Sequence, residues 1–281
     1  MDVLAIDIGG TKVTIARVDH TGLVGDELRV PTVGSAKELI DNIIAAGQSL
    51  LTGHQQACGV GTCGPLRDGL FVSPVNIPVW REFPIQQALA DGLGIPTYVD
   101  GDGKALALAE GWKGAAIGHS NYISMVVSTG IGGGIVLNGQ LLHGRTGAAG
   151  HIGHVVVEPR GHRCGCGTIG CVEAEASGTA IKAITGRPAQ DASAEVRAQT
   201  GRLVGRAVGI VANLLDLPLA TIGGSVALGF GDAFFGPAQI EATERCQMTY
   251  SRDVRIVPTG LGDDGPIIGA AAVALRRVGL A

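Results

Sequence analysis

The 281-residue sequence lacks the features of three large classes of protein. It contains no run of eighteen apolar residues, which a membrane-spanning helix would need. Its 21 basic and 25 acidic residues give a net charge of -4 without a cationic cluster, so nothing predicts nucleic-acid binding. The opening MDVLAIDIGG does not have the basic, apolar and small-residue regions of an export signal. These absences predict a cytoplasmic protein with reduced thiols and a small-molecule partner.

Two common phosphate-binding signatures are also missing. No G-x-x-x-x-G-K-[ST] sequence occurs, and the glycines at 130 and 132 precede an extended run instead of the helix of a dinucleotide fingerprint. What the chain has in abundance is glycine, with 46 residues that gather in short clusters instead of linkers. This distribution predicts backbone that approaches ligands closely.

A strand, glycine turn and strand occur twice in the sequence. Residues 3–7 are apolar, residues 8–12 break the run, and residues 13–18 resume an extended pattern. About 120 residues later, 122–127 and 135–137 repeat the design around the break at 128–134. The repetition predicts two similar lobes, each opening with a glycine hairpin, and the length of the chain suits two domains.

Helical and extended patterns alternate along the rest of the chain. Helices are expected at residues 36–51, 84–92, 104–113, 177–184, 195–215 and 269–278. Strands are expected at residues 59–62, 97–99, 220–222 and 255–257. Strands that alternate with helices predict an α/β fold.

The two glycine hairpins are candidates for phosphate binding. Their backbone N–H groups can surround an anion, because glycine lets the chain approach phosphate oxygens. Asp7 is suited to a hydrated Mg²⁺, while Thr11, Lys12 and Thr129 add donors for phosphates. Either hairpin taken alone is equally well explained as an ordinary turn.

A histidine and three cysteines have the spacing of a structural zinc site. His154 precedes Cys164 by ten residues, and Cys166 and Cys171 follow at short spacings. Three thiolates and one imidazole are a common ligand set for tetrahedral zinc. His162 is an alternative fourth ligand, and free structural thiols are the alternative to a metal site. Disulfide pairing would require an exported protein.

Four motifs in order resemble those of the ROK family of sugar kinases and sugar-responsive repressors. They are DIGGTK at 7–12, STGIGGGI at 128–135, GHIGH…CGCGTIGCVE at 150–173, and IGGS at 222–225. The resemblance covers nearly the whole chain. It implies the actin-like, ribonuclease-H-like fold of hexokinase, with two lobes that close on ATP and sugar, and a cytoplasmic homodimer.

The implied small N-terminal lobe comprises residues 1–115 and 266–281. The large lobe comprises residues 116–265 and contains the zinc knuckle at 154–171. Repressors of the family carry a helix-turn-helix domain before the kinase-like part, whereas this sequence begins directly with the first strand, which favours a kinase. A sugar-sensing protein without catalysis is the main alternative, and an actin-like or chaperone-type ATPase would not need the knuckle.

The resemblance also implies roles for individual residues. Asp102 takes the position of the catalytic base, although an Asp-Gly turn that caps the following helix is the alternative interpretation. ATP and phosphate binding fall to Asp7, Gly9, Gly10, Thr11, Lys12, Thr129, Gly130, Gly223 and Gly224, with Mg²⁺ bound alongside the nucleotide.

Sugar binding is implied for a second group of residues. His154 would bind both zinc and a sugar hydroxyl, and Glu173 would accept hydrogen bonds from hydroxyls near C1 and C2. Gly64 would lie against the sugar. Asn76 would lie near the mouth of the pocket, with an Asx turn before Pro78 as the alternative.

Two positions depart from the family pattern. Gly101 replaces an asparagine and His151 replaces a glutamate, and both family side chains contact hydroxyls around C3 and C4. A buried hydroxyl left without partners costs about 1–3 kcal/mol, which makes a plain glucose pocket less favourable. A C3 amine could instead meet Asp100 and Glu173, although Lys104 adds unfavourable positive charge. Phosphorylation of the 6-hydroxyl of kanosamine (3-amino-3-deoxy-glucose) is therefore the leading expectation, followed by glucose and an N-acylated hexosamine. The alternative is a relaxed pocket and a slow or promiscuous enzyme.

Overall fold

The computed structural model describes residues 2–64, 66–67, 70–74 and 77–280. Asn76, which the resemblance places near the mouth of a sugar pocket, lies outside the described residues. Among the helices that are described, none has both the length and the apolar composition needed to cross a bilayer.

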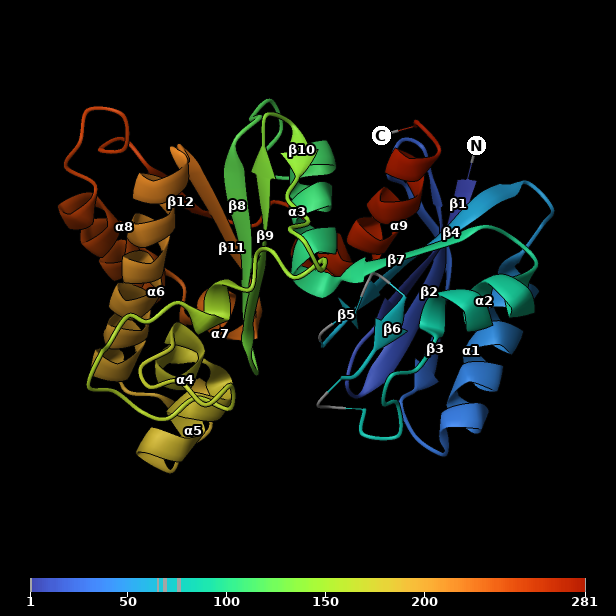
Figure 1. The fold of residues 1–281 in the computed structure, drawn as a ribbon, viewed down its shortest axis with the longest axis horizontal. Coiled ribbons are helices and arrows are strands. Elements are labelled where there is room, and N and C mark those ends of the chain that lie inside the picture. The colour runs from blue at the N-terminus through green and yellow to red at the C-terminus, as the bar shows by residue number, and fades with distance from the viewer. Residues whose placement is uncertain (1, 65, 68–69, 75–76, 281) are drawn as a thin grey trace. The chain divides into compact units, whose positions relative to one another are not determined.

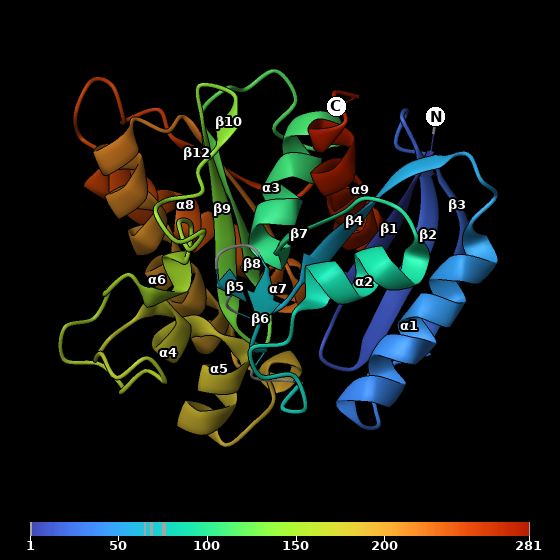
Figure 2. The same ribbon diagram turned by 45° about the vertical axis from the view of Figure 1, so that its right-hand side comes forward.

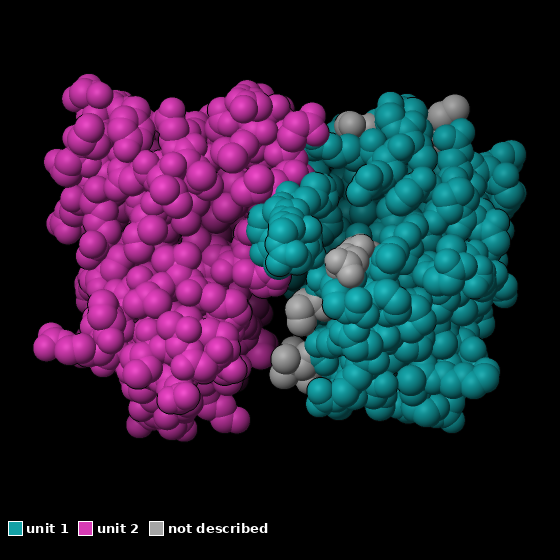
Figure 3. Space-filling model, in the orientation of Figure 1, with its two compact units in different colours: residues 1–113, 143–149, 263–281 teal, residues 114–142, 150–262 magenta. Residues whose placement is uncertain are grey.

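The chain folds into two compact units, which Figure 3 colours separately. Unit 1 comprises residues 1–113, 143–149 and 263–281, and unit 2 comprises residues 114–142 and 150–262. The lobes expected from the sequence divide instead at 115/116 and 265/266. The expected division also leaves 143–149 in the larger lobe, whereas the contacts of this segment assign it to unit 1.

Unit 1 is built on a five-stranded mixed sheet. From edge to edge its strands are β3 (Val24–Pro31), β2 (Lys12–Asp19), β1 (Asp2–Ile8), β4 (Gln55–Thr62) and β7 (Thr97–Gly101). The other elements of unit 1 are α1 (Ala36–Leu50), β5 (Leu66–Arg67), β6 (Phe71–Val72), α2 (Ile85–Leu93), α3 (Asp102–Lys113) and α9 (Gly265–Arg277). β1 pairs antiparallel with β2 and parallel with β4, so the first predicted hairpin lies inside this sheet (Figure 1).

Side chains of β4 alternate between the two faces of the sheet. Cys58 and Val60 belong to the same buried cluster as Leu39 of α1, together with residues of α2. On the opposite face a Cβ added to Gly59 would lie 1.9 Å from the carbonyl oxygen of Ala270 in α9. Figure 2 shows the resulting layers within this unit, with α1 and α2 on one side of the sheet and α9 on the other. Glycine at 59 therefore allows helix and strand backbones to touch.

Unit 2 is built on a second five-stranded sheet. Its strands are β10 (Gln140–Leu141), β9 (Ile131–Leu137), β8 (Tyr122–Val127), β11 (Leu219–Gly223) and β12 (Arg255–Pro258). The helices are α4 (Val172–Ala176), α5 (Gly178–Thr185), α6 (Ala194–Leu215), α7 (Ser225–Phe230) and α8 (Asp232–Arg245), with short 3₁₀ turns η1 (Ile152–His154), η2 (Ala189–Asp191) and η3 (Gly262–Asp264). β8 pairs antiparallel with β9 and parallel with β11, which repeats the arrangement around β1.

Helices α6 and α8 pack closely against each other where α6 has glycine residues. Added Cβ atoms at Gly201 and Gly205 of α6 would lie 2.3 and 2.2 Å from the carbonyl oxygens of Phe234 and Ala238. The two helices lie side by side in Figures 1 and 2 and share one buried cluster with β8 and β11. This cluster is the core of unit 2.

All of the predicted helices and strands are present, with ends that differ by at most four residues. One expectation is wrong, since residues 131–134 belong to β9 instead of the break expected at 128–134. β9 begins at Ile131, and Gly133 pairs with Met125 across the ladder. β3 and α8 are not predicted, because β3 is a mostly exposed edge strand and α8 contains Pro237 without an apolar stripe.

Candidate active site

The first glycine hairpin has a turn that is held from both sides. Within the turn the N–H of Gly9 donates to the carbonyl of Lys12 at 3.0 Å. Thr32, the residue directly after β3, donates its hydroxyl to the carbonyl of Gly9 at 2.9 Å and its N–H to the carbonyl of Thr11 at 3.1 Å. Thr32 was not predicted as part of this site, because it is more than twenty residues away in the sequence and depends on the β2–β3 pairing.

Two carboxylates beside this hairpin are near enough for the charge of one to affect the pKa of the other. Asp7 is in β1, and Asp102 is the first residue of α3, directly after β7. Burial and, to a lesser extent, the negative charge of Asp102 raise the pKa of Asp7 to about 7, although the cation of Lys12 acts in the opposite direction. Asp102 also accepts a hydrogen bond from the N–H of Gly103 at 2.7 Å, which is the adjacent residue and not the second or third helical residue that an N-cap side chain bonds. The site therefore combines repelling carboxylates with a glycine turn, a setting that favours bound cations.

The turn after β4 lies close to the same carboxylates. Cys63 donates its N–H to the carbonyl of Ile8 at 3.3 Å, which joins this turn to the end of β1. Burial raises the pKa of the Cys63 thiol to about 12, with contributions from Asp102 and Asp7. The next residue, Gly64, has a φ of +89° and packs against Pro74 with no room for a side chain. Asp7, Asp102 and Gly64 are thus gathered in one region of unit 1.

Asp100 and Lys104 form a buried ion pair next to Asp102. Their Oδ1 and Nζ atoms are 3.6 Å apart, and the Lys104 side chain is only 6% exposed. Lys104 also donates to the carbonyl of Gly147, and the second oxygen of Asp100 faces His143 at 3.8 Å. These contacts attach segment 143–149 to unit 1, and they engage the carboxylate that was expected to meet a substrate amine.

Gly101 leaves open space at the end of β7. A Cβ added there would meet no atom of the described residues within 4 Å. The position could hold a side chain, so its glycine is not required by packing in unit 1.

The second glycine hairpin belongs to unit 2 and is held by backbone contacts. Its turn closes with a hydrogen bond from the N–H of Ser128 to the carbonyl of Gly130 at 2.9 Å. Ser128 and Ser225 have hydroxyl oxygens 2.9 Å apart. Gly224 has a φ of +95°, and a Cβ added to it would lie 2.4 Å from the Val127 carbonyl oxygen. Four predicted phosphate-binding residues are therefore brought together in unit 2: Thr129, Gly130, Gly223 and Gly224.

The cysteines and one histidine form the predicted cluster. The ligand atoms of His154, Cys164, Cys166 and Cys171 all lie within 4.8 Å of one another. The Cys164 sulfur is 3.7 Å from His154 Nδ1, and the Cys166 and Cys171 sulfurs are also 3.7 Å apart. A tetrahedral zinc ion with bonds of about 2.3 Å to sulfur separates its ligands by roughly 3.8 Å, so the cluster fits zinc.

The alternative ligand His162 makes a different contact. Its Nδ1 lies 2.9 Å from Glu175 Oε2, and its N–H donates to the other oxygen of Glu175. All six cysteines are described, and all are free thiols. The structure therefore favours His154 over His162 and gives no support to disulfide pairing.

The sugar-binding candidates of unit 2 lie next to this cluster. The rings of His151 and His154 are nearly parallel, with centroids 6.3 Å apart. Because His154 turns Nδ1 toward sulfur, its Nε2 points away from the cluster, as a shared role for metal and ligand requires. Glu173 lies in α4, two residues after Cys171, and accepts a hydrogen bond from the N–H of Ile131 at 2.9 Å.

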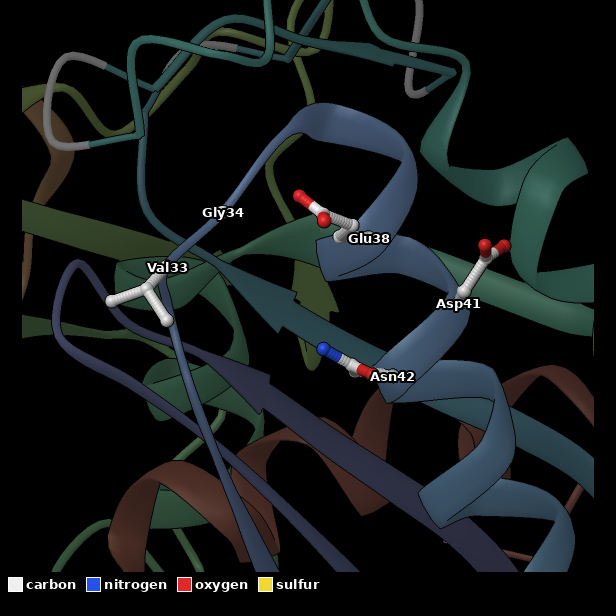
Figure 4. Close-up of a pocket in the computed structure, with 5 residues that line it drawn as sticks. All are labelled: Val33, Gly34, Glu38, Asp41 and Asn42. Atoms are coloured by element: carbon white, nitrogen blue, oxygen red, sulfur yellow. The ribbon is translucent and has the colours of Figure 1, made fainter.

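A hollow of about 420 Å³ lies elsewhere in unit 1 (Figure 4). Its lining consists of Val33, Gly34, Glu38, Asp41 and Asn42. Glu38 serves the start of α1 by accepting hydrogen bonds from Ser35. Of the predicted site residues that the structure describes, none lines this hollow, so its acidic groups belong to the helix and not to the candidate site.

We predict that Asp7→Asn stabilises the protein at high pH when Mg²⁺ and nucleotide are absent. The raised pKa means that the folded state binds more protons than the unfolded state between about pH 4 and pH 7. The free energy of unfolding of the wild type should therefore fall through this window. By pH 8 the variant should be more stable by about 4 kcal/mol, which corresponds to the rise in the pKa of Asp7 to about 7, and the difference should vanish near pH 4.

Urea unfolding at pH 4, 6 and 8 measures this effect. Asp253→Asn is the control, because that carboxylate is 90% exposed and should give no pH-dependent difference. Identical wild-type and Asp7→Asn curves at pH 8 would show that Asp7 is not destabilised by burial and Asp102.

The chain is similar to known proteins along nearly its whole length. The model of the ROK family matches residues 3–277. The chain is 34% identical to the N-acetylmannosamine kinase of Escherichia fergusonii over 98% of each chain. A ROK hexokinase from Thermus thermophilus superposes with a TM-score of 0.88 at 31% identity, covering 99% of each chain. A ROK family glucokinase from Streptomyces griseus, solved in complex with glucose and AMPPNP, superposes with a TM-score of 0.80 at 28% identity, covering 96% of this chain and 98% of the other.

Proposed function

The chain belongs to the ROK family and is a sugar kinase with the two-lobed actin-like fold, and we propose that it transfers the γ-phosphoryl group of ATP to the 6-hydroxyl of a hexose. The observation that carries this proposal is that Asp102 lies near the buried Asp7 beside the first glycine hairpin, where its charge raises the pKa of Asp7. A carboxylate at that position can accept the proton of an attacking hydroxyl. The complex of the Streptomyces griseus glucokinase with glucose and AMPPNP supports ATP as the donor.

Asp102 is the proposed general base. It accepts the proton of the 6-hydroxyl while the sugar oxygen attacks the γ-phosphorus. A bond forms between that oxygen and phosphorus, and the bond from phosphorus to the bridging oxygen of ADP breaks. The backbone N–H groups of the turns that contain Gly10 and Gly130 and the cation of Lys12 balance the phosphate charge in this proposal.

Mg²⁺ is proposed to accompany the nucleotide and to neutralise phosphate charge in the transfer. Asp7 is the residue best suited to hold it through water. Its pKa is raised to about 7 by burial and by Asp102, so a cation relieves an unfavourable charge there.

Zn²⁺ is proposed to be structural and to be held by His154, Cys164, Cys166 and Cys171. The support is their ligand set and separation. Zinc held by these four residues would fix the ring of His154, whose other nitrogen could then meet a sugar hydroxyl.

Removal of a single ligand should release this metal. We predict about one zinc per chain in the wild type and a large loss in His154→Gln, measured by mass spectrometry of the metal content. His162→Gln is the matched control, since the His162 ring contacts Glu175 instead of the sulfurs, and it should keep its zinc. Loss of zinc from His162→Gln with retention in His154→Gln would reverse the assignment.

N-acetylmannosamine is the proposed sugar. The support is the 34% identity to the N-acetylmannosamine kinase of Escherichia fergusonii. Kanosamine, the leading expectation from the sequence, is less favoured because Lys104 already engages the Asp100 carboxylate that would meet its amine.

An ADP-release assay tests the activity and the sugar together. N-acetylmannosamine should be turned over faster than glucose, kanosamine, glucosamine or N-acetylglucosamine. Asp102→Asn should lower kcat about 1000-fold, because the amide cannot accept the proton. The variant should still show sugar-dependent protection against thermal unfolding, which separates loss of chemistry from loss of binding.

Three outcomes would overturn parts of this proposal. Normal turnover by Asp102→Asn would remove the base assignment. Faster reaction with kanosamine or glucose would remove the sugar assignment. Protection by sugars without ADP release from the wild type would support the sugar-sensing alternative instead of a kinase.

A further inference from the structure

Three hydrogen bonds join the segment after the knuckle to the second glycine hairpin, all within unit 2. Glu173 Oε2 accepts from the N–H of Ile131 at 2.9 Å. The N–H of Gly178 donates to the carbonyl of Ser128 at 2.7 Å, and the N–H of Thr179 donates to the carbonyl of Thr129 at 3.1 Å. Two of these bonds are backbone to backbone, so only the Glu173 bond depends on the type of side chain.

The contact between Glu173 and the hairpin leaves no spare volume. A Cβ added to Gly130 would lie 2.9 Å from Glu173 Oε2. A Cβ added to Gly153 would lie 2.2 Å from the Ile131 carbonyl oxygen and 3.4 Å from Glu173 Cβ. The GHIGH segment, α4 and the start of β9 are therefore packed as one body around the Glu173 side chain.

We propose that Glu173 positions the nucleotide-binding hairpin in addition to its role toward the sugar. Its Oε2 fixes the N–H of Ile131 and with it one end of the turn that contains Thr129 and Gly130. Its Oε1 is the other oxygen of the same carboxylate and is assigned to sugar hydroxyls in this proposal. This inference rests on the proposed function and deepens it, because one side chain then serves both substrates.

The arrangement predicts that the two substrates are coupled. A sugar hydroxyl that donates to Oε1 restrains the carboxylate, and the restrained carboxylate holds Ile131 in place for the phosphates. Coupling between binding sites is reciprocal, so the nucleotide should increase the affinity for sugar by the same factor. The Ser128 and Gly178 contacts hold the other end of the turn independently of Glu173. Loss of Glu173 should therefore loosen the Ile131 end and leave the hairpin folded.

Calorimetric titration of Mg²⁺-AMPPNP without sugar tests the positioning role. Glu173→Ala removes the acceptor for Ile131 and should weaken AMPPNP binding about 10-fold. Glu173→Gln keeps an oxygen acceptor, so it should bind AMPPNP like the wild type while losing affinity for sugar. Glu175→Ala is the matched control, because Glu175 is in the same helix and faces His162, and its AMPPNP affinity should stay unchanged.

Hydrogen exchange of the peptide that covers residues 128–134 provides a second measurement. Exchange should be faster in Glu173→Ala than in the wild type, Glu173→Gln or Glu175→Ala, with zinc content and circular dichroism unchanged. Wild-type AMPPNP affinity and wild-type exchange in Glu173→Ala would overturn the positioning role alone. Absence of AMPPNP binding to the wild type would overturn the proposed function as well.

Discussion

Contact between backbones at glycine is the constraint on which both units depend. In unit 1, Gly59 lets β4 touch α9 at the Ala270 carbonyl. In unit 2, Gly205 does the same for α6 and α8, and Gly153 brings the GHIGH segment against Ile131. A methyl group at any of these three positions would meet backbone and not a movable side chain. The 46 glycines are therefore explained partly by packing and only partly by ligand binding.

The two other aspartates near Asp102, Asp7 and Asp100, differ in how their negative charges are compensated. Asp7 keeps a raised pKa because its burial and its carboxylate neighbour are only partly offset by Lys12. Asp100 is instead matched by Lys104, a buried cation with a hydrogen bond to Gly147. One carboxylate is thus left to attract a cation, and the other is used to attach segment 143–149. This difference assigns the two aspartates to separate tasks.

Local patterns explain what the sequence could predict. The duplicated strand-turn-strand units, the knuckle and the main helices depend on nearby residues, and the strand order of the two sheets agrees with the duplication. Contacts between distant residues were not predictable. They include the hydrogen bonds of Thr32 with the first hairpin, of Lys104 with Gly147, and of Glu173 with Ile131. Each of these requires the tertiary fold to bring two distant segments together, and the local sequence pattern of neither segment predicts the other as its partner.

Product identification tests the central claim, that this protein phosphorylates the 6-hydroxyl of a hexose. The enzyme would be incubated with Mg²⁺-ATP and N-acetylmannosamine, and the product examined by two-dimensional correlation of proton and phosphorus resonances. The account predicts a new phosphomonoester whose phosphorus couples to the two protons on C6. Coupling to the proton on C1, or release of inorganic phosphate with no phosphorylated sugar, would contradict it.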